Sequence, residues 1–343
     1  MGGRSYRVNQ ESSRIHSSRT ILVLLVCLLL LAAGFSLLIG RYPSVQISSP
    51  AAIAADEMAY RLVMNLRFPR MLIAILLGMS LSAAGLVFQM IFGNPLVEPG
   101  FLGVSQGASF GAAFAIIFLG NTAALVQTSA ALFAIAGLVL SYFFAHRLRY
   151  GGWVLRLVLA GIAVSALFSS GVGILKYMAD PLSQLPEITF WLLGGLSSST
   201  WGKFLSILPV VTISLVVLLL LRWRLNLLSL SDAAAFSLGA SPRVERGVLL
   251  GAAVLAVASV ISVSGMVTWV GLIVPHIARR LFGADSRVTL PATLLIGGLF
   301  TLLCDDLARI LLPGEIPLGV ITSLLGAIGF IFLLSMTGIR SQR

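Results

Sequence analysis

Three ionisable residues, Asp305, Asp306 and Arg309, lie inside one apolar stretch of the sequence. Charged side chains are costly in a lipid-embedded helix, so they are usually functional or paired with one another. Asp305 and Arg309 are four residues apart and share one face of a helix, which predicts an intrahelical ion pair. Unpaired carboxylates at mid-membrane depth would instead be typical of an ion-coupled secondary transporter. We rank a secondary transporter as the second hypothesis, because Arg309 is present as a partner for these carboxylates.

Other catalytic and ligand-binding patterns are absent from the sequence. The chain's only Gly-Lys pair, Gly202-Lys203, lacks the upstream glycine of a Walker A motif, so the chain cannot itself be an ATPase. The histidines and cysteines are scattered, without metal-ligand or disulfide spacing. They are His16, His146, His276, Cys27 and Cys304. We therefore expect no catalytic, cofactor-binding or metal-binding residues and no enzymatic activity.

The composition excludes a soluble globular protein. Apolar residues make up 58% of the 343 residues and charged residues only 10%, against roughly 45–50% and 25% in an ordinary soluble domain. The net charge of +11 could indicate nucleic acid, but basic residues beside membrane spans have a more common cause in cytoplasmic retention of Lys and Arg. We expect an all-α polytopic membrane protein with no nucleic-acid partner.

Apolar runs long enough to cross a bilayer recur along the chain, at about 20 residues per crossing. We count ten. The stretch 247–283 is short for two crossings, so one of its two spans must be short or tilted. The predicted spans are 20–40, 68–92, 100–119, 122–145, 154–175, 190–221, 247–264, 267–283, 290–312 and 316–337.

The basic residues support ten spans, because only an even number of crossings between clusters keeps them all on the cytoplasmic side. Merging 247–283 into one span would put the last clusters outside. We expect both termini in the cytoplasm, with tails at 1–19 and 338–343 and a membrane domain at 20–337. The clusters are Arg4/Arg7/Arg14/Arg19, His146/Arg147/Arg149/Arg156, Arg222/Arg224/Arg243/Arg246, Arg279/Arg280/Arg287 and Arg340/Arg343.

A short sequence repeat indicates inverted symmetry. Gly85-Leu-Val precedes Pro95 at the same interval as Gly265-Met-Val precedes Pro275. An odd number of predicted spans separates the copies, so they would lie in opposite orientations, as in the inverted repeats of many transporters. Chance matching among apolar residues is the competing explanation.

The longest interior loop, 222–246, contains a predicted short helix. Ser231 or Asp232 could cap a helix at 233–238, Gly239 could end it and Pro242 could open the next element. Such a helix could receive force from a soluble partner, or it could lie on the lipid headgroups as an amphipathic connector.

A minority of basic residues fall on the predicted outer side. Arginines at span ends can snorkel to lipid phosphates; the alternative is a docking surface for an acidic protein. Arg67 and Arg70 flank the start of the second span, and Arg309 lies near the end of the ninth. The outer basic residues are Arg41, Arg61, Arg67, Arg70, Lys176, Lys203 and Arg309.

Four motifs, in order along the chain, resemble those of one protein family. They are RFPR at 67–70, GNPLVEPGFLGVSQGASFGA at 93–112, GLIVPHIARR at 271–280 and EIPLGVITSLLG at 315–326. Together they resemble the permease subunit of ABC importers for iron-siderophore complexes, haem and cobalamin, a FecCD-type permease. The resemblance runs from about residue 20 to 337 and implies a ten-helix subunit that dimerises around a central path.

The resemblance also implies roles for particular residues. Arg67, Arg70 and Arg309 match the family's outer arginines, which meet an acidic binding protein, and Asn94 and Leu96 match its inner gate. The family's ATPase-contacting loop matches 226–243. Its expected coupling residues are Asp232, Phe236, Leu238, Gly239 and Ala240.

The implied partners are a second permease subunit, two cytoplasmic ATP-binding subunits, an extracytoplasmic substrate-binding protein and membrane lipid. ATPase closure would move the loop at 226–243 and so alternate access through the gate, in the cytoplasmic membrane of a bacterium or archaeon. Relatives of this scaffold carry siderophore-bound iron, haem, cobalamin or molybdate-type oxyanions, so the cargo stays open, as does the choice between a homodimer and a paralogous pair.

Overall fold

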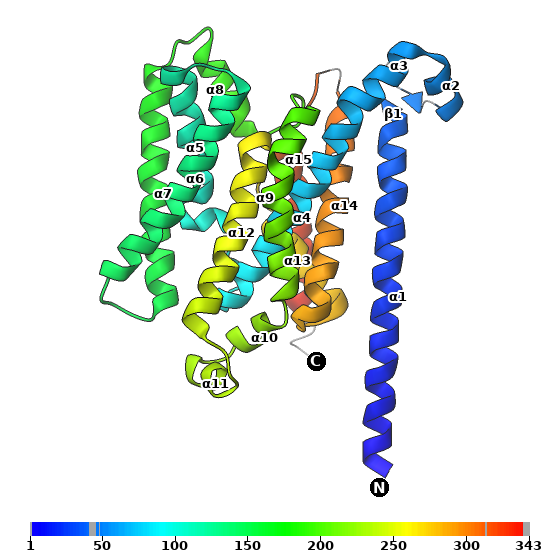
Figure 1. Cartoon of the computed structure of the whole chain (residues 1–343), viewed down its shortest axis with the longest axis vertical. Helices are drawn as coiled ribbons and strands as arrows, with labels where there is room; N and C mark the ends of the chain where they lie inside the picture. The colour runs from blue at the N-terminus through cyan, green and yellow to red at the C-terminus, as the bar shows by residue number, and fades with distance from the viewer. Residues whose placement is uncertain (1, 41–45, 48, 313, 339–343) are drawn as a thin grey trace.

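The computed structural model describes the backbone of residues 2–40, 46–47, 49–312 and 314–338, and this part of the chain is almost entirely helical (Figure 1). Side chains of residues 1–19 lie outside the description, as does everything beyond Gly338. The predicted tails, their arginines and Arg41 are therefore not placed.

Seven helices in the described residues are long and apolar enough to cross a membrane. Each of the seven overlaps a predicted span, although the second begins at Glu57, 11 residues before the predicted start at 68. They are Thr20–Leu38 within α1 (Gly2–Leu38), the continuous helix of α3 (Glu57–Leu62), the π-helical η1 (Val63–Arg67) and α4 (Phe68–Phe92), then α6 (Ala123–Arg147), α7 (Trp153–Met178), α9 (Trp201–Leu220), α12 (Pro242–Ser264) and α14 (Ser286–Ile310).

The other three predicted spans are also helical, although they are not among these seven. They are α5 (Val104–Phe114) continued by the π-helical η3 (Ala115–Leu119), then α13 (Val270–Phe282) and α15 (Leu318–Gly338). At 1.5 Å per residue the 13 residues of α13 reach only about 20 Å. The predicted all-α fold is confirmed, and α13 is the short member of the pair in 247–283.

Two predicted boundaries are wrong. The span at 190–221 is broken, because α8 (Gln184–Leu193) ends at Gly194, whose φ of 68° takes the chain out of the helix, and α9 starts only at Trp201. The span at 247–264 begins earlier, at Pro242, since proline is favoured in the first turn of a helix. The loop predicted at 222–246 is correspondingly shorter.

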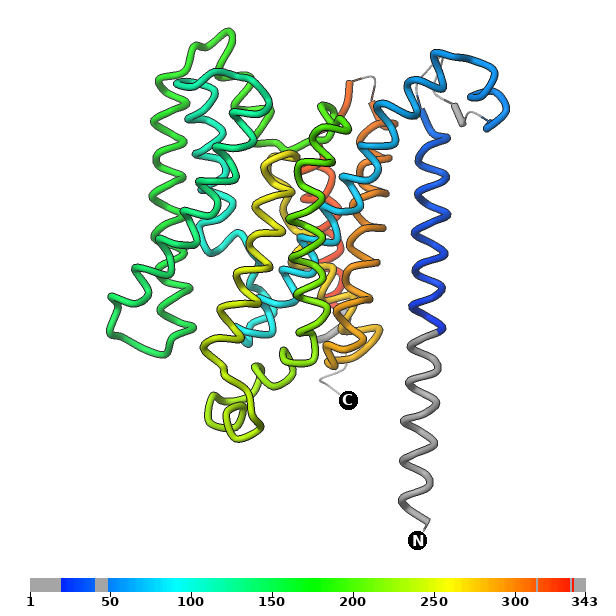
Figure 2. Tube along the Cα trace, in the orientation of Figure 1, coloured from blue at the N-terminus to red at the C-terminus, as the bar shows by residue number. Residues whose placement is uncertain are grey.

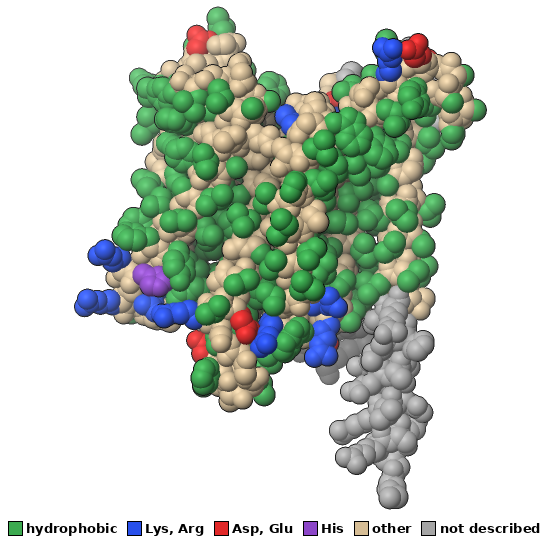
Figure 3. Space-filling model, in the orientation of Figure 1, with side chains coloured by type: hydrophobic (Ala, Val, Ile, Leu, Met, Phe, Trp, Pro, Cys, Tyr) green, Lys and Arg blue, Asp and Glu red, His purple; other side chains and the backbone are tan. Residues whose placement is uncertain are grey.

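The charges separate the two ends of the bundle. One end, the α11 end, carries α10 (Arg224–Leu228), α11 (Asp232–Ser237) and the end of α15 (Figure 1). Basic side chains gather there, at the bottom of Figure 3, as the predicted clusters require. The opposite end, the α3 end, carries α8, α2 (Pro50–Ala55), α3 and the strand pair β1 (Ile39–Gly40) and β2 (Gln46–Ile47).

The centre of the bundle is a close contact between α4 and α14. A Cβ added at Gly78 would collide with the carbonyl oxygen of Gly297, so only glycine fits. Thr301 Oγ1 donates a 2.7 Å hydrogen bond to the Ala74 carbonyl across the same contact. Small residues and interhelical hydrogen bonds stabilise helix pairs in lipid, where apolar side chains alone give little preference.

The repeat motif occupies two antiparallel helices. The chain runs along α4 away from the α3 end and along α12 back toward it (Figure 2), the opposite orientation expected of an inverted pair. The local structures differ, because Gly85 lies inside α4 whereas Gly265 ends α12 with a φ of 67°.

Candidate functional site

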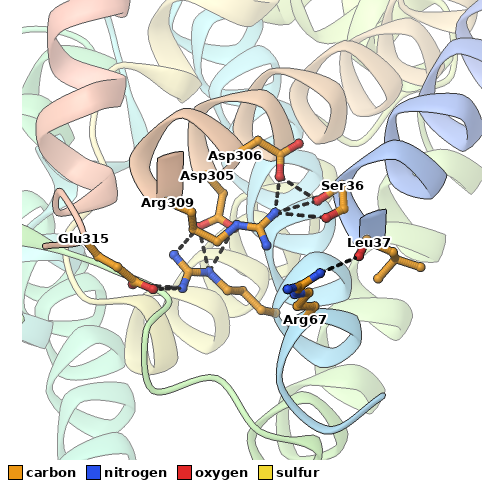
Figure 4. Close-up of polar contacts among 8 residues, drawn as sticks. Ser36, Leu37, Arg67, Asp305, Asp306, Arg309 and Glu315 are labelled. Atoms are coloured by element: carbon orange, nitrogen blue, oxygen red, sulfur yellow. Dashed lines mark hydrogen bonds and ion pairs between the residues drawn. The ribbon is translucent and has the colours of Figure 1, made fainter. Parts of the chain in front are cut away.

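The three predicted outer arginines meet at the α3 end. Arg67, Arg70 and Arg309 line one cavity of about 320 Å³, which is also walled by β1 and by the segment between α8 and α9. Ser199, in this wall, has a buried hydroxyl with no partner within the described residues. Figure 4 shows Arg309 of α14 beside Asp305, Asp306 and Ser36, and Arg67 of η1 beside Leu37.

Arg70 is held between two carboxylates. Its Nε and Nη2 lie 2.9–3.1 Å from the buried Asp305, while its Nη1 lies 2.9 Å from both oxygens of Glu315. Asp305 is fully buried, whereas the Glu315 side chain is 44% exposed. Arg70 therefore ties the start of α4 to α14 and to the loop before α15.

Arg309 joins α14 to α1. It pairs with Asp306 and lies 3.5 Å from Asp305, so the predicted intrahelical pair is confirmed. Its Nη2 also donates to the Ser36 hydroxyl at 2.9 Å and to the Ser36 carbonyl at 3.3 Å, and the same hydroxyl donates to Asp306 at 2.6 Å. Sequence reasoning missed Ser36, because nothing in an apolar first span marks one serine as an ion-pair ligand.

Arg67 differs from the other two arginines. Its Nη1 donates to the Leu37 carbonyl at 3.1 Å, and it has no carboxylate partner among the described residues. The cluster as a whole holds three arginines and three carboxylates, so it is close to electrically neutral. Of the three predicted docking arginines, Arg67 is the one whose charge is least offset by its neighbours.

The predicted short helix in the interior loop is confirmed as α11, Asp232–Ser237. The hydroxyl of Ser231 caps it by accepting the Ala234 N–H at 3.4 Å. Gly239 follows with a φ of 80°, a left-handed conformation that glycine adopts without strain. A Cβ at Gly239 would meet nothing within 4 Å, so the space around this residue is open.

The predicted coupling residues divide into two groups. Phe236 is 73% exposed and Leu238 60% exposed, which puts two large apolar side chains on the outermost helix of the α11 end. Asp232 pairs with Arg246 at 2.7 Å and Ala240 is buried, so these two hold the loop in place. Exposed apolar groups on a fixed element are typical of a protein contact.

Polar contacts fix this loop to the bundle. Arg224 of α10 lies 3.2 Å from Glu245 of α12 and donates to the Gly239 carbonyl. Asn226 bonds Asp285 at 2.7 Å and accepts the Ser286 N–H at 2.9 Å, both at the start of α14. These contacts connect the segment of α10 and α11 to α12 and to the start of α14.

The predicted gate residues lie in the turn that follows α4. Asn94 Oδ1 accepts the Leu96 N–H at 2.9 Å, which closes the turn. Leu96 is 51% exposed, whereas its neighbour Val97 is buried. The turn thus presents one apolar side chain outward from an ordered backbone.

A bundle of this kind, with many apolar crossings, a charged cavity at one end and a fixed short helix at the other, is that of a multi-pass membrane permease. The chain belongs to the FecCD transport family, whose model matches residues 22–336. It is accordingly a permease subunit of an ABC importer.

Similar proteins include the "Probable iron chelatin transport system permease protein" of Helicobacter pylori, 39% identical over 92% of this chain and 96% of that protein. The molybdate import system permease protein MolB of Haemophilus influenzae is 38% identical over 90% and 93%. A solved metal-chelate type ABC transporter in an inward-facing conformation matches with a TM-score of 0.85 and 37% identity, over 93% of this chain and 99% of that one.

Proposed function

We propose that this permease works with a second permease subunit, two ATP-binding subunits at the α11 end and a substrate-binding protein at the α3 end. The α11 end would then face the cytoplasm, with both termini, in the inner membrane of a bacterium or archaeon. The clustering of basic residues at the α11 end supports this orientation.

One relationship carries the proposal. The bundle has the exposed Phe236 and Leu238 at one end and the cavity with Arg67 at the other. Helix α14 contributes residues to both ends. An importer needs this arrangement, because ATP-driven movement at one end must change access at the other. The gate turn at Asn94 and Leu96 would contact its copy across the two-fold axis.

We propose a metal chelate, such as an iron-siderophore complex, haem or cobalamin, as the cargo. The similar solved structure is of metal-chelate type, and the relative from Helicobacter pylori is named for an iron chelatin. The relative named for molybdate makes an oxyanion the competing cargo.

An ion-coupled secondary transporter is the alternative function. It would use Asp305 or Asp306 as the ion site, but both are paired with arginines at one end of α14. In a secondary transporter the carboxylate must bind an ion from one side and release it to the other. A fixed arginine partner would compete with that ion for the carboxylate.

Reconstitution in vesicles tests both the mechanism and the cargo. We expect uptake of a ferric chelate, haem or cobalamin only when the ATPase subunit, ATP and the binding protein are all present. Uptake driven by a proton or sodium gradient alone would instead support the secondary transporter, and uptake of molybdate but of no chelate would overturn the cargo assignment.

A further inference from the structure

A basic pocket separate from the arginine cavity lies at the α11 end. Trp153 and Arg156 of α7, Asp232 of α11, and Arg243 and Arg246 of α12 line a cavity of about 170 Å³. Three arginines and one aspartate give it an excess of positive charge. We infer that this α7–α12 pocket binds the phosphate of an anionic phospholipid headgroup.

Two buried hydrogen-bond donors in the pocket wall have no acceptor among the described residues. Arg246 is only 8% exposed; it pairs with Asp232 and donates to the Leu228 carbonyl at 3.3 Å, yet its Nε has no partner in the described part of the chain. The Nε of Arg156 is buried and unpartnered in the same way. Buried donors are normally satisfied, and phosphate oxygens are strong acceptors for arginine.

Arg243 completes the set at the pocket mouth. It is exposed, and its guanidinium group forms no hydrogen bond or ion pair with any residue that the structure describes. The cavity has room for several waters at about 30 Å³ each, and hence for a phosphate group. An anion here would add a charged partner for Arg243 without breaking the Arg246–Asp232 pair.

The depth of the pocket favours a lipid over a soluble anion. Trp153 and Arg156 lie in the first turn of α7, and Arg243 and Arg246 near the start of α12, where each chain segment enters its span. Tryptophan is enriched at the membrane–water interface. Basic pockets between spans bind anionic lipid headgroups.

The surface of α7 beyond the pocket suits acyl chains. Leu155, Leu159 and Ile162 are 43%, 43% and 54% exposed and form one apolar stripe along the helix. Leu159 is three residues after Arg156 and so lies beside it, one turn deeper into the span. A diacyl lipid can use the arginines and this stripe together, whereas a free phosphate can use only the arginines.

Native mass spectrometry of the delipidated, detergent-purified permease tests the inference. The chain is titrated with phosphatidylglycerol, with zwitterionic phosphatidylcholine and with glycerol 3-phosphate, which lacks acyl chains. We expect phosphatidylglycerol to be retained about tenfold more tightly than phosphatidylcholine, which corresponds to about 1.4 kcal/mol. Millimolar glycerol 3-phosphate should not displace it.

Three variants locate the site. Arg243→Gln and Arg156→Gln should each abolish the preference for phosphatidylglycerol, and Arg243→Gln disturbs no contact within the described residues, so its folding should be intact. Arg287→Gln, an exposed arginine at the same end of the bundle, should bind lipid as the unaltered protein does.

Three results would overturn the inference. The first is an unchanged lipid preference in both pocket variants, and the second is displacement by glycerol 3-phosphate, which would indicate a soluble anion. The third is normal lipid binding with loss of the ATP-binding subunit, which would make the arginines a protein contact. The first two results do not depend on whether the importer function is correct, whereas the third rests on the proposed ATP-binding subunit.

Discussion

Arg70 presents the Nε–Nη2 edge of its guanidinium group to Asp305 and its Nη1 to Glu315, with Nη1 lying 2.9 Å from both Glu315 oxygens. Asp305 belongs to α14, and Glu315 lies in the segment between α14 and α15. Glu315 therefore occupies the guanidinium edge that a docking carboxylate would otherwise meet. In the described conformation the unpaired charge of the cavity is that of Arg67.

The two partners of Arg70 should differ sharply in their effect on stability. Asp305→Asn leaves Arg70 and Arg309 short of a buried counter-charge, and breaking a buried pair costs about 3–5 kcal/mol. Glu315→Gln removes a half-exposed carboxylate, for which about 0–1 kcal/mol is typical. Thermal unfolding in detergent should show a large drop in apparent Tm for the first variant and little change for the second. Equal drops would mean that Glu315, too, is structural.

Charge reversal at Arg67 should weaken docking of an acidic binding protein. Arg67→Glu places like charges face to face, while Arg67→Ala should slow association only modestly, since rim charges act mainly on association rate. Arg67→Glu combined with Arg309→Glu should abolish docking. These losses should shrink as salt rises, because screening operates over about 8 Å at physiological ionic strength. Surface plasmon resonance at two salt concentrations measures the effect.

Arg61→Gln is the matched control for that experiment. Arg61 lies at the same end but forms an exposed pair with Glu57 at 2.5 Å and does not line the cavity. Its loss should leave docking unchanged. If Arg67→Glu binds as well as Arg61→Gln at low salt, the cavity arginines only fasten helices together and the binding protein docks elsewhere.

A bulky residue at Gly239 should uncouple the permease from its ATP-binding subunit. The open space around Gly239 accepts a large side chain without an internal clash, and the strain of a φ of 80° costs about 1–2 kcal/mol, so Gly239→Trp should fold and yet block a close approach. Gly239→Asn provides the control, because asparagine tolerates the left-handed backbone at little cost. Copurification of the ATPase and ATP-driven uptake should be lost only in the tryptophan variant. Normal coupling in Gly239→Trp would remove this loop from the contact.

Single cysteines at the gate should cross-link between two copies of the chain. In a background without Cys27 and Cys304, Asn94→Cys and Leu96→Cys should form intermolecular disulfides, which need Cα atoms within about 7 Å. Val97→Cys, whose position is buried, should not. Absence of dimer bands for both gate positions in every nucleotide state would place the two-fold axis elsewhere.

The fold was largely predictable from the apolar runs, and the failures have identifiable causes. The span at 190–221 was predicted as continuous across Gly194 because the apolar run starts before this residue. The polar residues at 197–200 do indicate a break in the span. The arginine cluster was found only through its departure from the charge bias. Its partners Asp305 and Glu315 could not be paired with Arg70, since 235 and 245 residues separate them and the sequence does not indicate which spans lie side by side.

The attachment of α1 has a consequence for the order in which the protein is made. Only 17% of its membrane span is buried against the bundle, so it enters the bilayer as an independent helix. The side chains that hold its end, Arg67, Asp306 and Arg309, are translated later, the last two near the end of synthesis. The first helix to leave the ribosome is therefore among the last to be fixed to the bundle. Truncation of the chain before α14 should leave α1 in the membrane without these contacts.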